Sequence, residues 1–239
     1  MSEQNSEQKY VDYFNQNVVE DQQDVITICE SASITIWDRF RIRFDDPRLL
    51  ASVTSKIYNT IVAKLLSLKK DYSSFTINIC DRLEMGYNTK EDEDDEKVGN
   101  YNVFVRHLNN TKKNNEIDDP TAKPIERAVQ WNTENVIEQP ELIRKISIDA
   151  SDALKEIDVN TATSELIMPI FITVYESLIN FLKIKRRETD QFEYEINFIS
   201  CFYIGARETD SDADDIYIRP SIDKKLGIKD DTAASAKYE

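Results

Sequence analysis

Apolar residues recur along the chain with two different periods, and each change of period marks an expected element. Between residues 34 and 44 the apolar positions alternate with polar ones, and a period of two predicts a strand with one solvated face. Between residues 49 and 66 apolar residues recur every three or four positions, directly after Asp-Asp-Pro at 45–47. This spacing predicts an amphipathic helix that has an Asp cap and ends near Lys70.

A β-hairpin with a strongly acidic connection is predicted after this helix. Residues 73–86 and 100–108 predict two strands, and the stretch NTKEDEDDEKVGN at 88–100 lies between them. Like charges in such a stretch repel one another in a compact conformation and are solvated in an extended one. We therefore expect a loop that protrudes into solvent or faces another molecule.

The second half of the chain follows the same plan. An apolar stripe at 166–182 predicts a second long helix, with Pro169 in its first turn or at a kink. Residues 191–205 and 214–222 predict strands, and the acidic stretch ARETDSDADD at 206–215 lies between them. A second protruding acidic loop is the consequence.

Matching residues in the two halves lie at nearly constant separations. Tyr58 and Tyr175 are 117 residues apart, and Gly86 and Gly205 are 119 residues apart. Beyond the acidic stretches the separation of matching residues falls to 113, so the second loop is the shorter one. The pattern predicts an internal duplication of a helix, strand, acidic loop and strand. The alternative is that helix followed by hairpin is a common local order and that the matches arose by chance.

These elements predict an α+β protein made of two pseudo-repeated helix plus β-hairpin units with long acidic hairpin loops. Polar stretches with few large apolar residues predict an arm, a linker and a tail outside the two units. The predicted parts are a flexible N-terminal arm at 1–23, a first α+β unit at 24–110, a linker at 111–124, a second α+β unit at 125–228 that includes a shorter helix at 141–157, and a flexible tail at 229–239.

The charge balance restricts the partners of this protein. With 45 acidic and 30 basic residues the chain carries a formal charge of −15, which disfavours attraction to phosphate backbones and anionic lipid. The N-terminus lacks the apolar region of a signal peptide. The longest apolar run, at 166–175, is half the ~20 residues that a bilayer span needs. We expect a soluble protein that is made and kept in the cytoplasm and does not bind a membrane.

No residue pattern indicates a catalytic or cofactor site. His107 is the single histidine of the chain, and no GxSxG motif supplies a nucleophile beside it. The four glycines lie far apart, so the phosphate-binding loops of nucleotide-dependent enzymes are absent. Cys29, Cys80 and Cys201 form no CxxC pair, which indicates neither a zinc module nor a disulfide framework. We predict no enzyme, no catalytic residue and no cofactor.

The second acidic stretch has one feature of a metal-binding loop. Asp210, Asp212 and Asp214 have the spacing with which carboxylates converge on Ca²⁺. In that register, however, Asp215 stands where the tight turn requires Gly, and Ser221 stands where the bidentate Glu belongs. We predict no specific metal site. Loose condensation of cations and a merely solvated hairpin tip remain the alternative interpretations of the loop.

The candidate functional residues are the loop carboxylates, in an electrostatic role. They are Glu91, Asp92, Glu93, Asp94, Asp95, Glu96, Asp210, Asp212, Asp214 and Asp215. Three functions are compatible with them. The first is a structural subunit of a ring through which DNA moves, since a negative lumen repels phosphates over about one Debye length, ~8 Å at physiological salt. The second is an acidic module that binds a basic partner or mimics DNA, and the third, least supported by motifs, is a metal-dependent hydrolase.

The plan of helix, strand, long hairpin loop and strand at 46–108 and at 164–222 resembles that of neck-ring and tail-terminator proteins of tailed bacteriophages. The Asn-, Lys- and Ile-rich stretches NNTKKNN and INFLKIKRR are similar to those of AT-rich phage proteins. The resemblance implies a virion protein that forms a homo-oligomeric connector ring between head and tail. It also implies contacts with other virion structural proteins and loops that line a passage through which DNA moves without specific binding.

Overall fold

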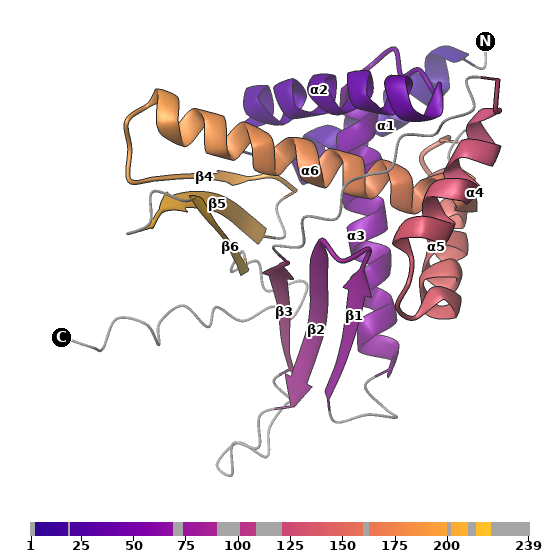
Figure 1. Cartoon of the computed structure of the whole chain (residues 1–239). Coiled ribbons are helices and arrows are strands. Elements are labelled where there is room, and N and C mark those ends of the chain that lie inside the picture. The colour runs from indigo at the N-terminus through magenta and orange to yellow at the C-terminus, as the bar shows by residue number, and fades with distance from the viewer. Residues whose placement is uncertain are drawn as a thin grey trace.

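The computed structural model describes residues 3–18, 20–68, 74–89, 101–108, 121–159, 163–199, 202–209 and 214–220 (Figure 1). The protein is α+β, as predicted. Its first half contains α1 (Glu3–Asn17), α2 (Gln22–Phe40), α3 (Arg48–Leu68), β1 (Ser74–Ile79), β2 (Leu83–Thr89) and β3 (Tyr101–His107). Its second half contains α4 (Pro124–Asn135), α5 (Pro140–Lys155), α6 (Ser164–Glu188), β4 (Glu193–Asn197), β5 (Phe202–Glu208) and β6 (Asp214–Pro220).

Each half therefore places three helices before three strands, and each set of strands forms an antiparallel sheet, in the order β1-β2-β3 and β4-β5-β6. The helices of the two halves pack against each other: α2 lies along α6, α5 lies along α3, and α3 crosses α6 (Figure 1). The two sheets meet where β3 lies beside β6. One hydrophobic core cluster takes residues from both halves.

The helix predicted after Asp46 is confirmed as α3, and its start has the expected cap. The backbone N–H of Arg48 donates to Asp46 Oδ1 at 2.9 Å, and the Arg48 guanidinium binds the same carboxylate at 2.7 Å. Burial raises the pKa of Asp46, but the hydrogen bonds and the charge of Arg48 outweigh it and leave that pKa below its usual range. The predicted helix at 141–157 is also confirmed, as α5.

The strand predicted at 34–44 is wrong, because residues up to Phe40 belong to helix α2. The buried residues of α2 are spaced by three or four positions, namely Val25, Ile28, Cys29, Ala32, Ile36 and Phe40. Ile34, which the alternation placed on the buried face, is 65% exposed. Over a short window the same apolar positions fit either a helix or a strand. Packing against α6 stabilises the helix.

The loose arm predicted at 1–23 is not observed for residues 3–17, which form α1. Phe14 and Val18 are buried in the core. The hydroxyl of Ser52 on α3 donates to the Tyr10 carbonyl at 2.9 Å, and the Tyr10 hydroxyl donates to Asp46 at 3.3 Å. A few apolar and polar anchors on one face are thus enough to fix a helix that is polar elsewhere.

The segment predicted as one strand at 73–86 is two strands, β1 and β2, joined by a tight turn. Cys80 and Asp81 both have positive φ values near 55°, as the type I′ turn of a two-residue hairpin requires. The backbone N–H of Arg82 donates to the Ile79 carbonyl at 3.1 Å, and the Asn78 side chain accepts from the Asp81 N–H at 2.8 Å. The turn contains no glycine, which is the residue that usually marks such a turn in a sequence, and it was therefore not predicted. The segment predicted as a strand at 191–205 likewise divides into β4 and β5.

Pro169 lies inside α6 rather than in its first turn. Proline has no backbone N–H, so the carbonyl of Glu165 loses its helical donor. The amide Nδ2 of Asn132 on α4 donates to that carbonyl at 2.7 Å. Among the described helices α6 is long and apolar enough to cross a bilayer, but 72% of the apolar window is buried inside the protein, as in a core helix.

Removing the hydrogen bond between Asn132 and Glu165 should lower the stability of the protein by a measurable amount. Asn132→Ala is expected to lower the free energy of unfolding by about 1 kcal/mol, because the Glu165 carbonyl is left without a donor. In a Pro169→Ala background the backbone N–H of residue 169 can donate instead, so the cost should fall below about 0.5 kcal/mol. Urea denaturation of the four proteins measures both costs, and equal costs in the two backgrounds would contradict this assignment.

Candidate functional site

Most of the predicted loop carboxylates fall outside the described residues. This applies to Glu91, Asp92, Glu93, Asp94, Asp95, Glu96, Asp210 and Asp212. Asp214 and Asp215 were predicted in the second loop, but they begin strand β6. Asp215 lies opposite Arg207 of β5 and forms an ion pair with it at 2.9 Å. Cross-strand pairing with a cation explains why Asp215 extends the ladder rather than the loop, whereas Asp214 lies opposite Glu208.

The strands on either side of each acidic stretch are partners in a sheet. Thr89 at the end of β2 pairs with Tyr101 at the start of β3, and Glu208 at the end of β5 pairs with Asp214 at the start of β6. Residues 90–100 and 209–213 therefore connect the paired ends of neighbouring antiparallel strands. The structure brings both predicted sites to equivalent ends of the two sheets.

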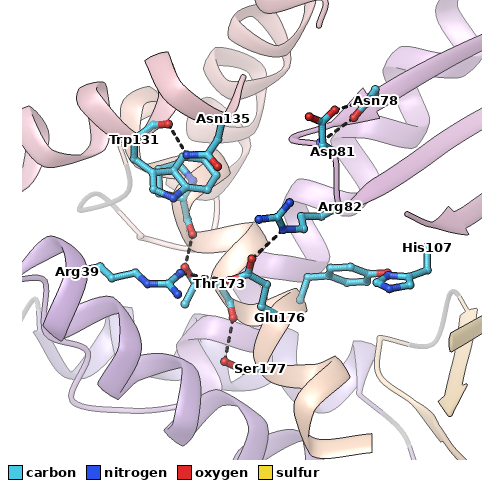
Figure 2. A network of polar contacts seen from close by, with 12 residues as sticks. Arg39, Asn78, Asp81, Arg82, His107, Trp131, Asn135, Thr173, Glu176 and Ser177 are labelled. Carbon is cyan, nitrogen blue, oxygen red and sulfur yellow. Dashed lines mark hydrogen bonds and ion pairs between the residues drawn. The ribbon is translucent and has the colours of Figure 1, made fainter. Parts of the chain in front are cut away.

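A partly buried charge cluster, which no motif indicated, lies where α6 passes α2 and the β1–β2 turn. The Glu176 carboxylate of α6 accepts from Arg82 Nε at 3.0 Å and from Arg39 Nη1 at 3.2 Å (Figure 2). The Arg82 side chain is 10% exposed and that of Glu176 is 22% exposed. One carboxylate thus holds two cations from the first half. Its position inside the apolar run at 166–182 is the one signal that could have indicated it.

The side chains beside this cluster do not supply a nucleophile. Burial raises the pKa of the Cys80 thiol to about 12, against the lowering effect of Arg82, so the thiol stays protonated near neutral pH. His107 Nδ1 and the Tyr175 hydroxyl are hydrogen-bonded at 2.9 Å. Burial also raises the pKa of Tyr175. The geometry is that of a structural tie between α6 and the first sheet.

Two further features bear on ligand binding. Within the described ranges, no three His, Cys, Asp or Glu side chains come close enough together to hold a metal ion. A groove of about 380 Å³ lies between α4 and α5, lined by Val129, Val136, Ile143 and polar side chains, among them Ser164 and Glu165 at the start of α6. The groove is more apolar than an ion site and lacks convergent catalytic groups.

Tyr194 of β4 ties the second sheet to α2 and gives a pH-dependent contribution to stability. Its hydroxyl donates to Asp24 Oδ2 at 2.7 Å. Burial, followed by this hydrogen bond and the charge of Asp24, raises the pKa of Tyr194 to about 12. The folded state therefore holds the proton more tightly than the unfolded state, whose tyrosine titrates near 10.

This contribution is fully present below pH 10 and is lost as the pH rises from about 10 to about 12. Tyr194→Phe is expected to cost about 1 kcal/mol at pH 7 and to make the melting temperature fall less steeply over that window. Asp24→Asn should also make the melting temperature fall less steeply over this pH range, because it keeps a hydrogen-bond acceptor and removes the charge. Thermal melts from pH 8 to 12 test both variants. An unchanged slope in Tyr194→Phe would show that other groups control stability there.

Comparison with known proteins gives no match to a protein-family model, to a curated protein or to a solved structure.

Proposed function

We propose that the chain is a non-enzymatic structural subunit of a virion head-to-tail connector ring, whose acidic strand connections face the DNA passage. The observation that carries the proposal is the placement of both acidic stretches between paired ends of neighbouring strands, at the same place in each half. Such a connection starts and ends at the edge of the sheet. Its carboxylates repel one another less when they are solvated than when they are packed together. A repeated acidic edge on a chain with a charge of −15 fits a surface that repels DNA.

The matching spacing of buried residues in the described helices supports an internal duplication, and with it the repeated presentation of these loops. The buried residues of α2 and α5 correspond at a separation of 118 residues, as Val25 does to Ile143 and Ile36 does to Leu154. The buried positions of α3 correspond to those of α6 at a separation of 117, from Leu50 and Ile167 onwards. The buried residues match along two pairs of helices. A chance similarity in the order of helix and hairpin would not require this match.

The sheets share an unusual local feature. Gly86 in the middle strand of the first sheet pairs with Phe104, and Gly205 in the middle strand of the second pairs with Tyr217. In both cases the aromatic ring covers the glycine so closely that a Cβ atom would collide with it. An Arg guanidinium lies over each of these rings, at 5.4 Å for Phe104 and 5.6 Å for Tyr217. The shared pair supports a common origin of the two sheets.

The packing between the halves is reciprocal, which supports a pseudo-two-fold relation. α2 of the first half packs on α6 of the second, and α5 of the second packs on α3 of the first. The corresponding helices α3 and α6 contact each other, as do the corresponding strands β3 and β6. This is the contact pattern of a symmetric dimer joined into one chain. Each subunit of a ring would then present two acidic loops.

Charge neutralisation tests the proposed role of the loops. Replacing the carboxylates at 91–96 with Gln and Asn is expected to leave assembly intact and to raise affinity for double-stranded DNA at least about tenfold at low salt. The control neutralises six exposed carboxylates elsewhere, namely Asp45, Glu138, Asp152, Glu188, Asp190 and Glu193. Fluorescence anisotropy measures binding. Equal affinities of the two variants would contradict a special role of the loop, and tight capture of a basic polypeptide by a monomer would favour a binding module.

A further inference from the structure

The groove between α4 and α5 has an apolar rim that the fold leaves exposed. Val129 on α4 is 48% exposed and lines the groove, and Ile148 on α5, beside the lining residue Ser147, is 40% exposed. Ile125, one turn before Val129 on α4, is 48% exposed. Residues that are four positions apart on a helix share a face, so the rim continues along α4. Such a groove between two helices suits a third helix with apolar side chains on one face.

A matching ridge lies on the outward face of α2. Ile34 is 65% exposed and Trp37 is 46% exposed, and the two are one turn apart on the helix. A tryptophan buries roughly 150–250 Å² when it is covered, and its side chain fits within the groove of about 380 Å³. In Figure 1, α2 lies at the top of the molecule, while α4 and α5 lie at its right side.

The corresponding half of the chain shows that the fold does not require an apolar ridge. At the separation of 118 residues that relates α2 to α5, Ile34 corresponds to Asp152 and Trp37 corresponds to Lys155. These two side chains form an ion pair at 2.7 Å on the surface of α5. The same helix face is thus polar in one half and apolar in the other. Exposed Ile34 and Trp37 need an explanation other than the core.

Two positions that line the groove have buried apolar counterparts in the first half. At the same separation of 118 residues, Asn132 and Val136 of the groove correspond to Phe14 and Val18. Phe14 is 2% exposed and Val18 is 1% exposed, so the first half fills with apolar side chains the place that stays open in the second. Two equivalent halves have thus diverged into one that carries a ridge and one that carries a groove.

Charge complementarity supports contact between these two surfaces. Glu30 and Asp38 are exposed on α2, on either side of the ridge, and neither forms an ion pair with another residue of the described chain. Arg144 on the wall of the groove is 72% exposed, and its pair with Glu141 is loose at 4.0 Å. The ridge also carries Arg41, whose guanidinium lies 5.8 Å from the centre of the Trp37 ring, and the groove also carries Glu165. Each surface thus presents charges of both signs, and such rim charges set orientation and encounter rate.

We propose that copies of this chain associate head to tail, with Ile34 and Trp37 of one copy docked in the α4–α5 groove of the next. The proposal rests on the proposed ring and names the subunit contact that builds it. In a head-to-tail contact each copy uses its ridge on one neighbour and its groove on another, so every docked copy still presents a free ridge or groove. Such a heterologous contact propagates, and it ends only when a ring closes.

Complementation between two variants tests this contact. Trp37→Asp destroys the ridge and keeps the groove, whereas Val129→Asp destroys the groove and keeps the ridge. Native mass spectrometry should find each variant monomeric. An equimolar mixture should form dimers that grow no further, since one intact ridge and one intact groove remain. Phe192→Asp, at a side chain that is 67% exposed on another part of the surface, is the control and should assemble like the unaltered protein.

The outcomes separate the contact from the ring. Assembly by either single variant, or a mixture that stays monomeric, would overturn the proposed contact while leaving a ring through other surfaces possible. Open filaments of the unaltered protein together with dimers in the mixture would support the contact and contradict the closed ring. Circular dichroism shows that the variants are folded. A misfolded Val129→Asp is replaced by Thr133→Arg, which blocks the same groove from an exposed position.

Discussion

Replacing Glu176 with Gln is expected to lower the free energy of unfolding by about 3 kcal/mol. The change keeps the size of the side chain but removes the charge that Arg82 and Arg39 share. Arg82, with a side chain that is 10% exposed, would keep its charge and lose the carboxylate that it binds at 3.0 Å, and breaking a buried ion pair in this way costs about 3–5 kcal/mol. We expect the lower end of that range because Arg39 is 31% exposed and can reach water. Equilibrium denaturation in urea measures the loss.

Two further variants show whether the loss comes from an uncompensated cation. In an Arg82→Met background, Glu176→Gln should cost about 1 kcal/mol, because the most deeply buried of its cations is gone. Glu188→Gln, which breaks the exposed pair with Lys185 at 3.4 Å, should cost less than about 0.5 kcal/mol. If Glu176→Gln cost no more than Glu188→Gln, the cluster would not hold α6 to the first half.

Replacing Gly86 with Ala is expected to cost about 2–3 kcal/mol, the second largest effect. A Cβ atom at this position would lie 2.9 Å from the Phe75 carbonyl oxygen and would collide with the Phe104 ring. Overpacking a filled site costs about 1–3 kcal/mol. The ring can be trimmed but the β1 backbone cannot, so Phe104→Leu should recover only part of the loss. Thermal and urea denaturation measure both variants.

Gly205→Ala provides the matched test in the second sheet. The nearest atoms to its added Cβ all belong to the Tyr217 side chain, which can move without shifting a strand. We expect a cost of about 1–2 kcal/mol that Tyr217→Leu recovers almost completely. A cost of Gly205→Ala that exceeds that of Gly86→Ala, or that persists with Tyr217→Leu, would show that the backbone rather than the ring limits the space.

The long helices and their order could be predicted, because a helix buried against a large core has apolar residues every three or four positions over its whole length. α3 and α6 have buried residues over almost their full length. α1 and α2 were missed for different reasons. α1 is polar except for a few anchors such as Phe14, and α2 has an apolar pattern that over residues 34–44 also fits a strand. In both cases the residues whose contacts stabilise the helix belong to another element of the fold.

The charge cluster could not be predicted from local pattern. Arg39 lies 137 residues from Glu176 and Arg82 lies 94 residues from it, so the contact exists only because α6 passes both α2 and the β1–β2 turn. The β1–β2 turn was hidden because Cys80 and Asp81 adopt positive φ without glycine. The proposed duplication rested in the sequence on a few positions such as Gly86 and Gly205, and the matching burial of α2 and α5 adds support for it.

Native mass spectrometry of the full chain at near-neutral pH and moderate salt tests the central claim most directly. A subunit that carries a ridge on one half and a groove on the other is predicted to form a closed oligomer of one size, at an integer multiple of the chain mass. A protein that remains monomeric at concentrations of tens of micromolar would contradict the account.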